Sequence, residues 1–82
     1  MEYQHTAEDQ AAKQSVKLYR TIQLPNDPHL QVVLCECGGF QPFVVWFFNR
    51  ECGGFHEGIY CKTLIDAVDA FCTRCRRYGA VP

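Results

Sequence analysis

The sequence ECGGFQPFVVWFFNRECGGF, residues 36–55, places an apolar run between two copies of one pentapeptide. The pentapeptide ECGGF begins at Glu36 and again at Glu51, fifteen residues later. Two glycines between apolar segments indicate a hairpin turn, because both can adopt the positive φ of a tight turn. The apolar run, residues 43–48, is therefore predicted to be a central strand with a hairpin at each end. Pro42 lacks the N–H that a strand ladder needs, so the first turn is expected to be looser than the second.

The segments around this stretch extend the meander. Residues 16–24 alternate between apolar and polar, which predicts a strand. The apolar residues expected on one face of that strand, interrupted by Arg20, are Val16, Leu18, Ile22 and Leu24. The sequence PNDP at 25–28 is a strong turn signal, and a second strand is expected over 30–35. The last strand is short and is expected to end near Cys61.

A helical pattern follows the last strand. Thr63 is a typical N-cap, and Gly79 suits the position after the final helical turn. The apolar face expected for this helix consists of Leu64, Ile65, Val68, Phe71, Cys72 and Cys75. At the other end of the chain, Thr6 can cap a short helix, and the pattern leaves open whether residues 1–15 form this helix or a flexible arm. The predicted fold class is α+β, an antiparallel four-stranded β-meander with a C-terminal helix packed on one face, in a single domain over residues 1–82.

Size and charge exclude several function classes. A chain of 82 residues and 9.4 kDa allows one small domain and excludes a two-domain enzyme. Eight Lys and Arg against nine Asp and Glu give a net charge of −1, which disfavours a dedicated nucleic-acid binder. The longest apolar run is far shorter than the roughly 20 residues of a membrane span. No basic and apolar leader pattern opens the sequence, so a cytoplasmic protein is expected.

Six cysteines are a large number for a chain of this length. In a reducing cytosol, free thiols or metal ligands are better interpretations than disulfides. The pairs Cys35-x-Cys37 and Cys72-x-x-Cys75 contain the four thiolates of a closed zinc site, so a small structural zinc module is one alternative. Consecutive turns of a meander lie at opposite ends of the sheet, however, so Cys37 and Cys52 are not expected to share a metal. No metal or cofactor is therefore assigned.

The patterns of an enzyme are not found. A nucleophilic cysteine needs a nearby base, and His56 is expected to point away from Cys52 and to pair with Glu51. The sequence has neither a glycine-rich phosphate loop before a helix nor an HExxH motif. Weak nucleic-acid binding is a further alternative, based on four cations near Tyr60 and Tyr78: Lys62, Arg74, Arg76 and Arg77. The last turn of a helix is also an ordinary place for the three arginines.

The central strand is apolar on both faces, and one terminal helix can cover only one of them. A two-residue turn at 53–54 places Phe47 opposite Tyr60 and Val45 opposite Lys62, and it pairs the opposite charges of residues 50 and 57. The face left over must be covered by the N-terminal segment, by a second copy, or by another protein. The partner-binding residues predicted on that face are Val45, Phe47, Tyr60 and Lys62.

A stretch of the chain resembles small proteins of bacteria and their phages. The resemblance covers residues 43–79 and rests on the motifs FFNR at 47–50, GGF at 53–55, LxxAxxAF at 64–71 and RRYG at 76–79. Single-domain proteins of this size are also similar to anti-CRISPR and other anti-defence inhibitors, a class without a common motif. The resemblance implies a non-enzymatic protein-binding module that inhibits a bacterial defence or regulatory complex by occluding it in the host cytoplasm, with a homodimer as the other option.

Overall fold

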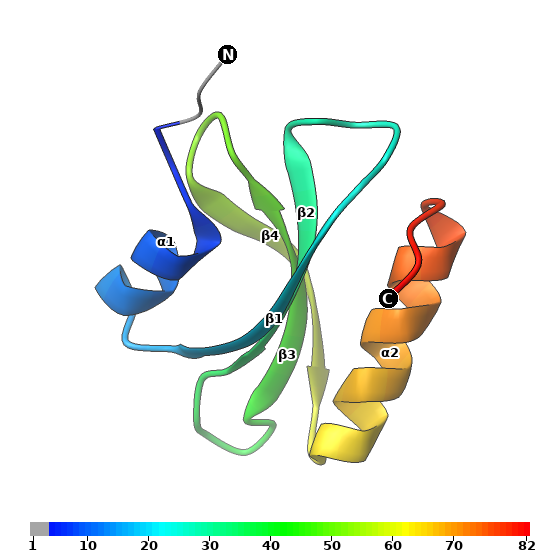
Figure 1. The fold of residues 1–82 in the computed structure, drawn as a ribbon. Coiled ribbons are helices and arrows are strands. Elements are labelled where there is room, and N and C mark those ends of the chain that lie inside the picture. The colour runs from blue at the N-terminus through cyan, green and yellow to red at the C-terminus, as the bar shows by residue number, and fades with distance from the viewer. Residues whose placement is uncertain (1–3) are drawn as a thin grey trace.

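A computed structural model describes residues 4–82, and Figure 1 shows one four-stranded sheet with a helix on either side. In chain order the elements are α1 (Ala7–Lys13), β1 (Lys17–Gln23), β2 (Leu30–Glu36), β3 (Phe43–Asn49), β4 (Gly54–Cys61) and α2 (Leu64–Arg77). The strands are antiparallel and lie in the order β1-β2-β3-β4, which confirms the predicted α+β meander with its C-terminal helix. Residues 1–3 of the predicted N-terminal arm lie outside the described residues. None of the helices in the described part is long and apolar enough to cross a membrane.

Both helices begin at the predicted caps. The Thr6 hydroxyl accepts a hydrogen bond from the Asp9 N–H at 3.1 Å, and the Thr63 hydroxyl accepts one from the Asp66 N–H at 3.2 Å. Each bond satisfies one of the N–H groups that the first helical turn leaves unpaired. At the other end of α2, Gly79 has φ 82°, as predicted for the residue that ends the helix. The short N-terminal helix, left open by the sequence, is therefore formed.

The turn between β3 and β4 differs from the prediction. Asn49 pairs with Gly54, so residues 50–53 form a four-residue loop in place of the two-residue turn. The Asn49 side-chain oxygen accepts hydrogen bonds from two backbone N–H groups of this loop, at 2.8 and 3.3 Å, and these bonds favour the longer turn. The predicted opposition of Arg50 and Glu57 is wrong, as are the other pairs counted from the same turn.

A bulge in β4 changes which face its side chains occupy. Residues 57–58 together oppose Trp46, and Glu57 has a positive φ of 53°. An extra residue on one strand shifts the alternation of its side chains by one position. Tyr60 therefore lies on the same face as Trp46. The prediction that it shares a face with Phe47 is wrong.

A second irregularity divides β1 between the two faces. The register shifts between Leu18 and Arg20, so Leu18 packs with the cluster on the α1 side and Ile22 packs with the cluster on the α2 side. The prediction that the apolar residues of 16–24 share one face is therefore wrong, because alternation along a strand holds only as far as the next bulge.

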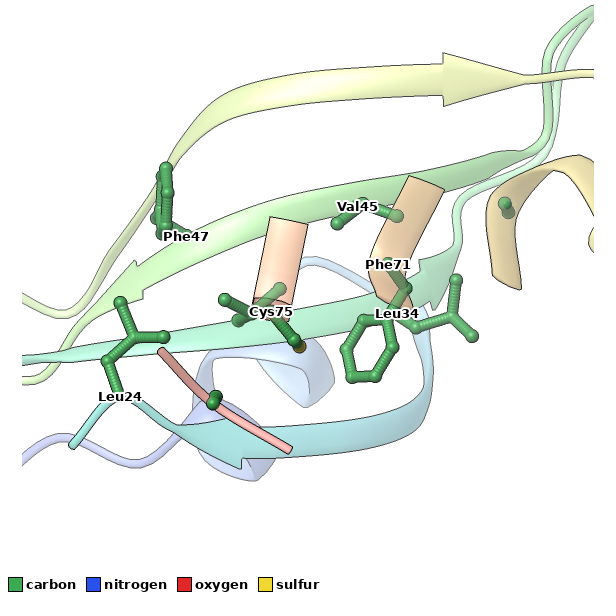
Figure 2. Close-up of a cluster of buried hydrophobic side chains, with 9 residues drawn as sticks. Leu24, Leu34, Val45, Phe47, Phe71 and Cys75 are labelled. Carbon is green, nitrogen blue, oxygen red and sulfur yellow. The ribbon is translucent and has the colours of Figure 1, made fainter. Parts of the chain in front are cut away.

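Each face of the sheet has its own buried cluster. The cluster under α2, shown in Figure 2, consists of Leu24, Val32, Leu34, Val45, Phe47, Ala67, Phe71, Cys75 and Ala80. The cluster on the α1 side consists of Ala7, Val33, Cys35, Val44, Trp46 and Phe48. Both faces of β3 are thus covered from within the chain, α2 taking the face that was predicted to remain open.

Candidate functional site

Two of the four predicted partner-binding residues are buried under α2. Val45 and Phe47 are 0% and 4% exposed. The Phe47 ring meets the Tyr78 ring edge-on at 5.1 Å, and the Arg74 guanidinium lies 4.4 Å above it. The expectation that these two side chains lie on an open face is wrong. The hydrophobic pattern could not decide this point, because both faces of β3 are apolar and either could receive the helix.

The other two predicted residues lie elsewhere. Tyr60 is 49% exposed and meets the Trp46 ring edge-on at 6.2 Å, on the face opposite Phe47. The Lys62 ammonium lies 4.5 Å from the centroid of the Phe40 ring, at the end of the sheet where α2 begins. The structure therefore does not bring the four predicted residues together on one surface.

The exposed apolar surface is found on α2 itself. At about 100° per residue, three exposed apolar residues fall within an arc about 100° wide on the helix, which overlaps at one edge the arc that packs on the sheet. These residues are Leu64, Ile65 and Val68, and we call them the α2 flank, whereas Cys72 in the same arc is half-buried and packs against the cluster under α2. Ile65 is 81% exposed, whereas Leu64 and Val68 are near 40%. The buried arc consists instead of Ala67, Phe71 and Cys75.

The helical pattern of apolar residues predicts that the α2 flank packs in the core, and this prediction is wrong. An apolar stripe on a surface helix is ordinarily about 100° wide, and this helix carries apolar residues over a considerably wider arc. That excess width is the feature of the sequence that could have indicated exposed apolar residues on α2. The contact with the sheet is centred on Ala67 and Phe71, which are 0% and 2% exposed, and the larger apolar residues on one side of them remain outside.

A groove of about 420 Å³ runs along the other side of α2, next to β4. Its lining residues are Phe47, Glu57, Ile59, Asp69, Ala70, Thr73, Arg74, Arg77 and Tyr78. Two acidic and two basic side chains balance its charge.

Arg74 also donates to the backbone carbonyls of Glu57 and Val45, at 2.7 and 3.3 Å, and burial lowers the pKa of its guanidinium. Arg74 therefore fastens the bulge of β4 to α2 and is not a free member of the cationic group considered for nucleic-acid binding.

The four thiols considered for zinc are not assembled. Cys35 belongs to the cluster on the α1 side, and Cys75 belongs to the cluster under α2, so the sheet separates them. Burial, with a smaller contribution from the neighbouring Cys37 thiol, raises the pKa of Cys35 to about 12, and burial also raises the pKa of Cys75. These buried thiols are neutral and behave as small apolar side chains. Within residues 4–82, no three His, Cys, Asp or Glu side chains gather as a metal site.

A cysteine and a histidine that were expected to diverge lie together. The Cys52 sulfur is 3.6 Å from His56 Nε2, and both side chains are exposed at the β3–β4 turn. Glu51 instead approaches His29, whose Nδ1 lies 3.6 Å from its carboxylate. The predicted separation failed because it assumed the two-residue turn, whereas the longer loop returns the Cys52 side chain toward the start of β4.

Comparisons with known proteins do not assign the chain to a family: no protein-family model, curated protein or solved structure matches it. The strongest features are the exposed α2 flank and the Cys52–His56 pair, which lie toward opposite ends of the sheet (Figure 1).

Proposed function

We propose that this protein is a non-enzymatic protein-binding module whose contact surface is the α2 flank. The observation that carries the proposal is the exposure of Ile65, at 81%, next to the half-exposed Leu64 and Val68. Contiguous exposed apolar side chains on a small protein typically mark an interaction site. Their spacing on one side of a helix fits a mode of recognition in which the helix lies in an apolar groove of the partner.

The proposed partner is a bacterial protein or protein complex. The resemblance of residues 43–79 to small proteins of bacteria and phages favours a defence or regulatory complex, in the manner of an anti-CRISPR inhibitor acting in the host cytoplasm. A rigid scaffold supports inhibition by occlusion, because α2 is packed on the sheet through Phe71 and Cys75 before any partner binds. Little conformational entropy is then lost on association.

The test replaces Ile65 with a charged residue. Tagged wild-type protein and Ile65→Glu are used to capture partners from bacterial lysate, and the affinity for the captured protein is then measured with purified components. A central apolar contact costs roughly 2 kcal/mol or more when lost, so Ile65→Glu is expected to weaken binding at least about 30-fold.

The matched control is Thr73→Glu, which places the same carboxylate on an exposed position of α2 outside the flank. It is expected to bind as the wild type does, and circular dichroism should show both variants folded. Equal binding by Ile65→Glu and wild type would exclude the α2 flank as the contact surface. If the wild-type chain captures only itself and Ile65→Glu does not, the flank is a homodimer interface and the inhibitor proposal fails.

A further inference from the structure

We infer that Cys52 and His56 form half of a zinc site, which a second copy of the chain completes. The inference is independent of the proposed function, because the pair lies at the β3–β4 turn and not on the α2 flank (Figure 1). Thiolate sulfur and imidazole nitrogen are the two donors that zinc uses most in closed sites. Both side chains are exposed, so a metal ion and a second molecule can reach them.

The distance between the two donor atoms fits a shared metal ion. Zinc lies about 2.3 Å from a thiolate sulfur and about 2.0–2.1 Å from an imidazole nitrogen. Two such bonds meeting at the tetrahedral angle place the sulfur and the nitrogen about 3.6 Å apart. The separation of Cys52 Sγ and His56 Nε2 is 3.6 Å. Zinc can therefore bind both atoms without a change in the spacing between them.

The backbone around the pair holds it in this arrangement. Asn49 fixes the loop through the backbone N–H of Cys52, and the Gly53 N–H donates to the Asn49 carbonyl at 2.8 Å. Gly54 leaves room for the imidazole: a Cβ there would lie 2.9 Å from His56 Nε2 and 3.6 Å from Cys52 Sγ. Gly54 does not have a positive φ, so the backbone conformation does not require glycine at this position. Its lack of a side chain instead leaves room for the His56 ring.

The chain alone supplies too few donors to close the site. Zinc in structural sites takes four ligands, and no third His, Cys, Asp or Glu joins the pair within residues 4–82. A two-fold axis through the metal ion brings a second Cys52 and a second His56, which gives the common set of two cysteines and two histidines. On binding, each Cys52 thiol loses its proton to solvent, so two protons leave for each zinc ion, and each His56 binds through Nε2 as the neutral ring.

The first repeat supplies a matched control within the same chain. Cys37 precedes two glycines and a phenylalanine as Cys52 does, and it is also exposed, but Gln41 stands where the second repeat has His56. A cysteine without the imidazole lacks the second donor. Replacing Cys37 therefore controls for the loss of an exposed thiol next to Gly-Gly.

The experiment titrates the reduced, metal-free full chain with zinc and follows mass by sedimentation and native mass spectrometry. We expect dimers that contain one zinc ion for two chains, and cobalt(II) should show the charge-transfer band of a thiolate-bound tetrahedral ion. Loss of outer-shell groups alone weakens metal binding 10–100-fold, so Cys52→Ser and His56→Ala are each expected to weaken it by at least about 100-fold. Gly54→Ala should also weaken it, whereas Cys37→Ser should change it less than about twofold.

Three results of this titration would overturn the inference, and a fourth comes from the Ile65→Glu variant. The wild-type chain could remain monomeric in excess zinc, it could bind one zinc ion per monomer, or Cys37→Ser could lose zinc-dependent dimerisation. Repeating the titration with Ile65→Glu separates this site from the α2 flank. Zinc-dependent dimers that persist in this variant support the site whatever the outcome for the proposed function, and their loss there would show that the flank forms the dimer instead.

Discussion

The two copies of ECGGF have the same five residues and different structures. Their first glycines are alike, with φ 80° at Gly38 and 77° at Gly53. The second glycines differ: Gly39 has φ 83°, whereas Gly54 does not have a positive φ and begins β4. The copies also differ at their first residues, because Glu36 is the last residue of β2 whereas Glu51 lies in the β3–β4 loop. The same five residues therefore end a strand in the first copy and begin one in the second.

The phenylalanines show the consequence. Phe40 is 82% exposed in the β2–β3 loop, whereas the Phe55 ring stacks on Trp46 with centroids 4.6 Å apart and planes within 9°. The neighbours outside the pentapeptide explain the difference. Pro42 keeps β3 from beginning before Phe43, which gives a six-residue loop, 37–42, between the strands. The comparison shows that a repeated sequence predicts a repeated turn only when its flanking residues are repeated as well.

The largest expected effect is the difference in stability between alanine variants of the two phenylalanines. Phe55→Ala removes the ring that packs on Trp46 and on Phe48, at 5.5 Å from the latter, and should lower the free energy of unfolding by about 2–3 kcal/mol. Phe40→Ala removes a ring that contacts mainly the Lys62 ammonium and should change it by no more than about 0.5 kcal/mol. Urea unfolding measures both, and equal losses would contradict the difference between the copies.

A smaller effect is expected at Asn49, whose counterpart fifteen residues earlier is Leu34. Asn49→Ala removes the acceptor of the Glu51 and Cys52 N–H groups, which then turn to water, so a loss of about 1 kcal/mol is expected. Asn49→Asp keeps an oxygen in the same place and should retain most of the stability in the same unfolding experiment. A loss in the aspartate variant as large as that in the alanine variant would show that the side-chain oxygen does not stabilise the loop.

The third effect is a pH dependence of stability that appears only in the alkaline range. Burial raises the pKa of Cys35, next to the first copy, from an ordinary 9.0 to about 12. The folded state thus holds the thiol proton more tightly than the unfolded state, so this contribution to stability is complete below pH 9 and is lost as the pH rises from about 9 through about 12. Thermal unfolding between pH 7 and 11 should show a steeper alkaline decline for wild type than for Cys35→Ala. Parallel declines would mean that Cys35 ionises equally in both states.

More of the fold than of the candidate site could be predicted from the sequence. Strong local signals gave the strands and the helix caps: Thr63 is followed by a helical period, and a turn signal follows the strand that ends at Gln23. The bulges at Tyr19 and at residues 57–58 left no comparable signal, and each reverses the face of the residues beyond it. The predicted contact surface failed because it depended on the register and on the face that α2 would choose.

The sequence alone determined the period of each segment, the ends of the helices and the order of the strands along the chain, because these follow from interactions between residues close together. Only the tertiary structure decided that α2 covers Val45 and Phe47 and that Ile65 remains outside. A strand that is apolar on both faces is compatible with a helix on either side, so the choice depends on how Ala67 and Phe71 fit the side chains beneath them. That fit involves residues distant in sequence, and no local pattern contains it.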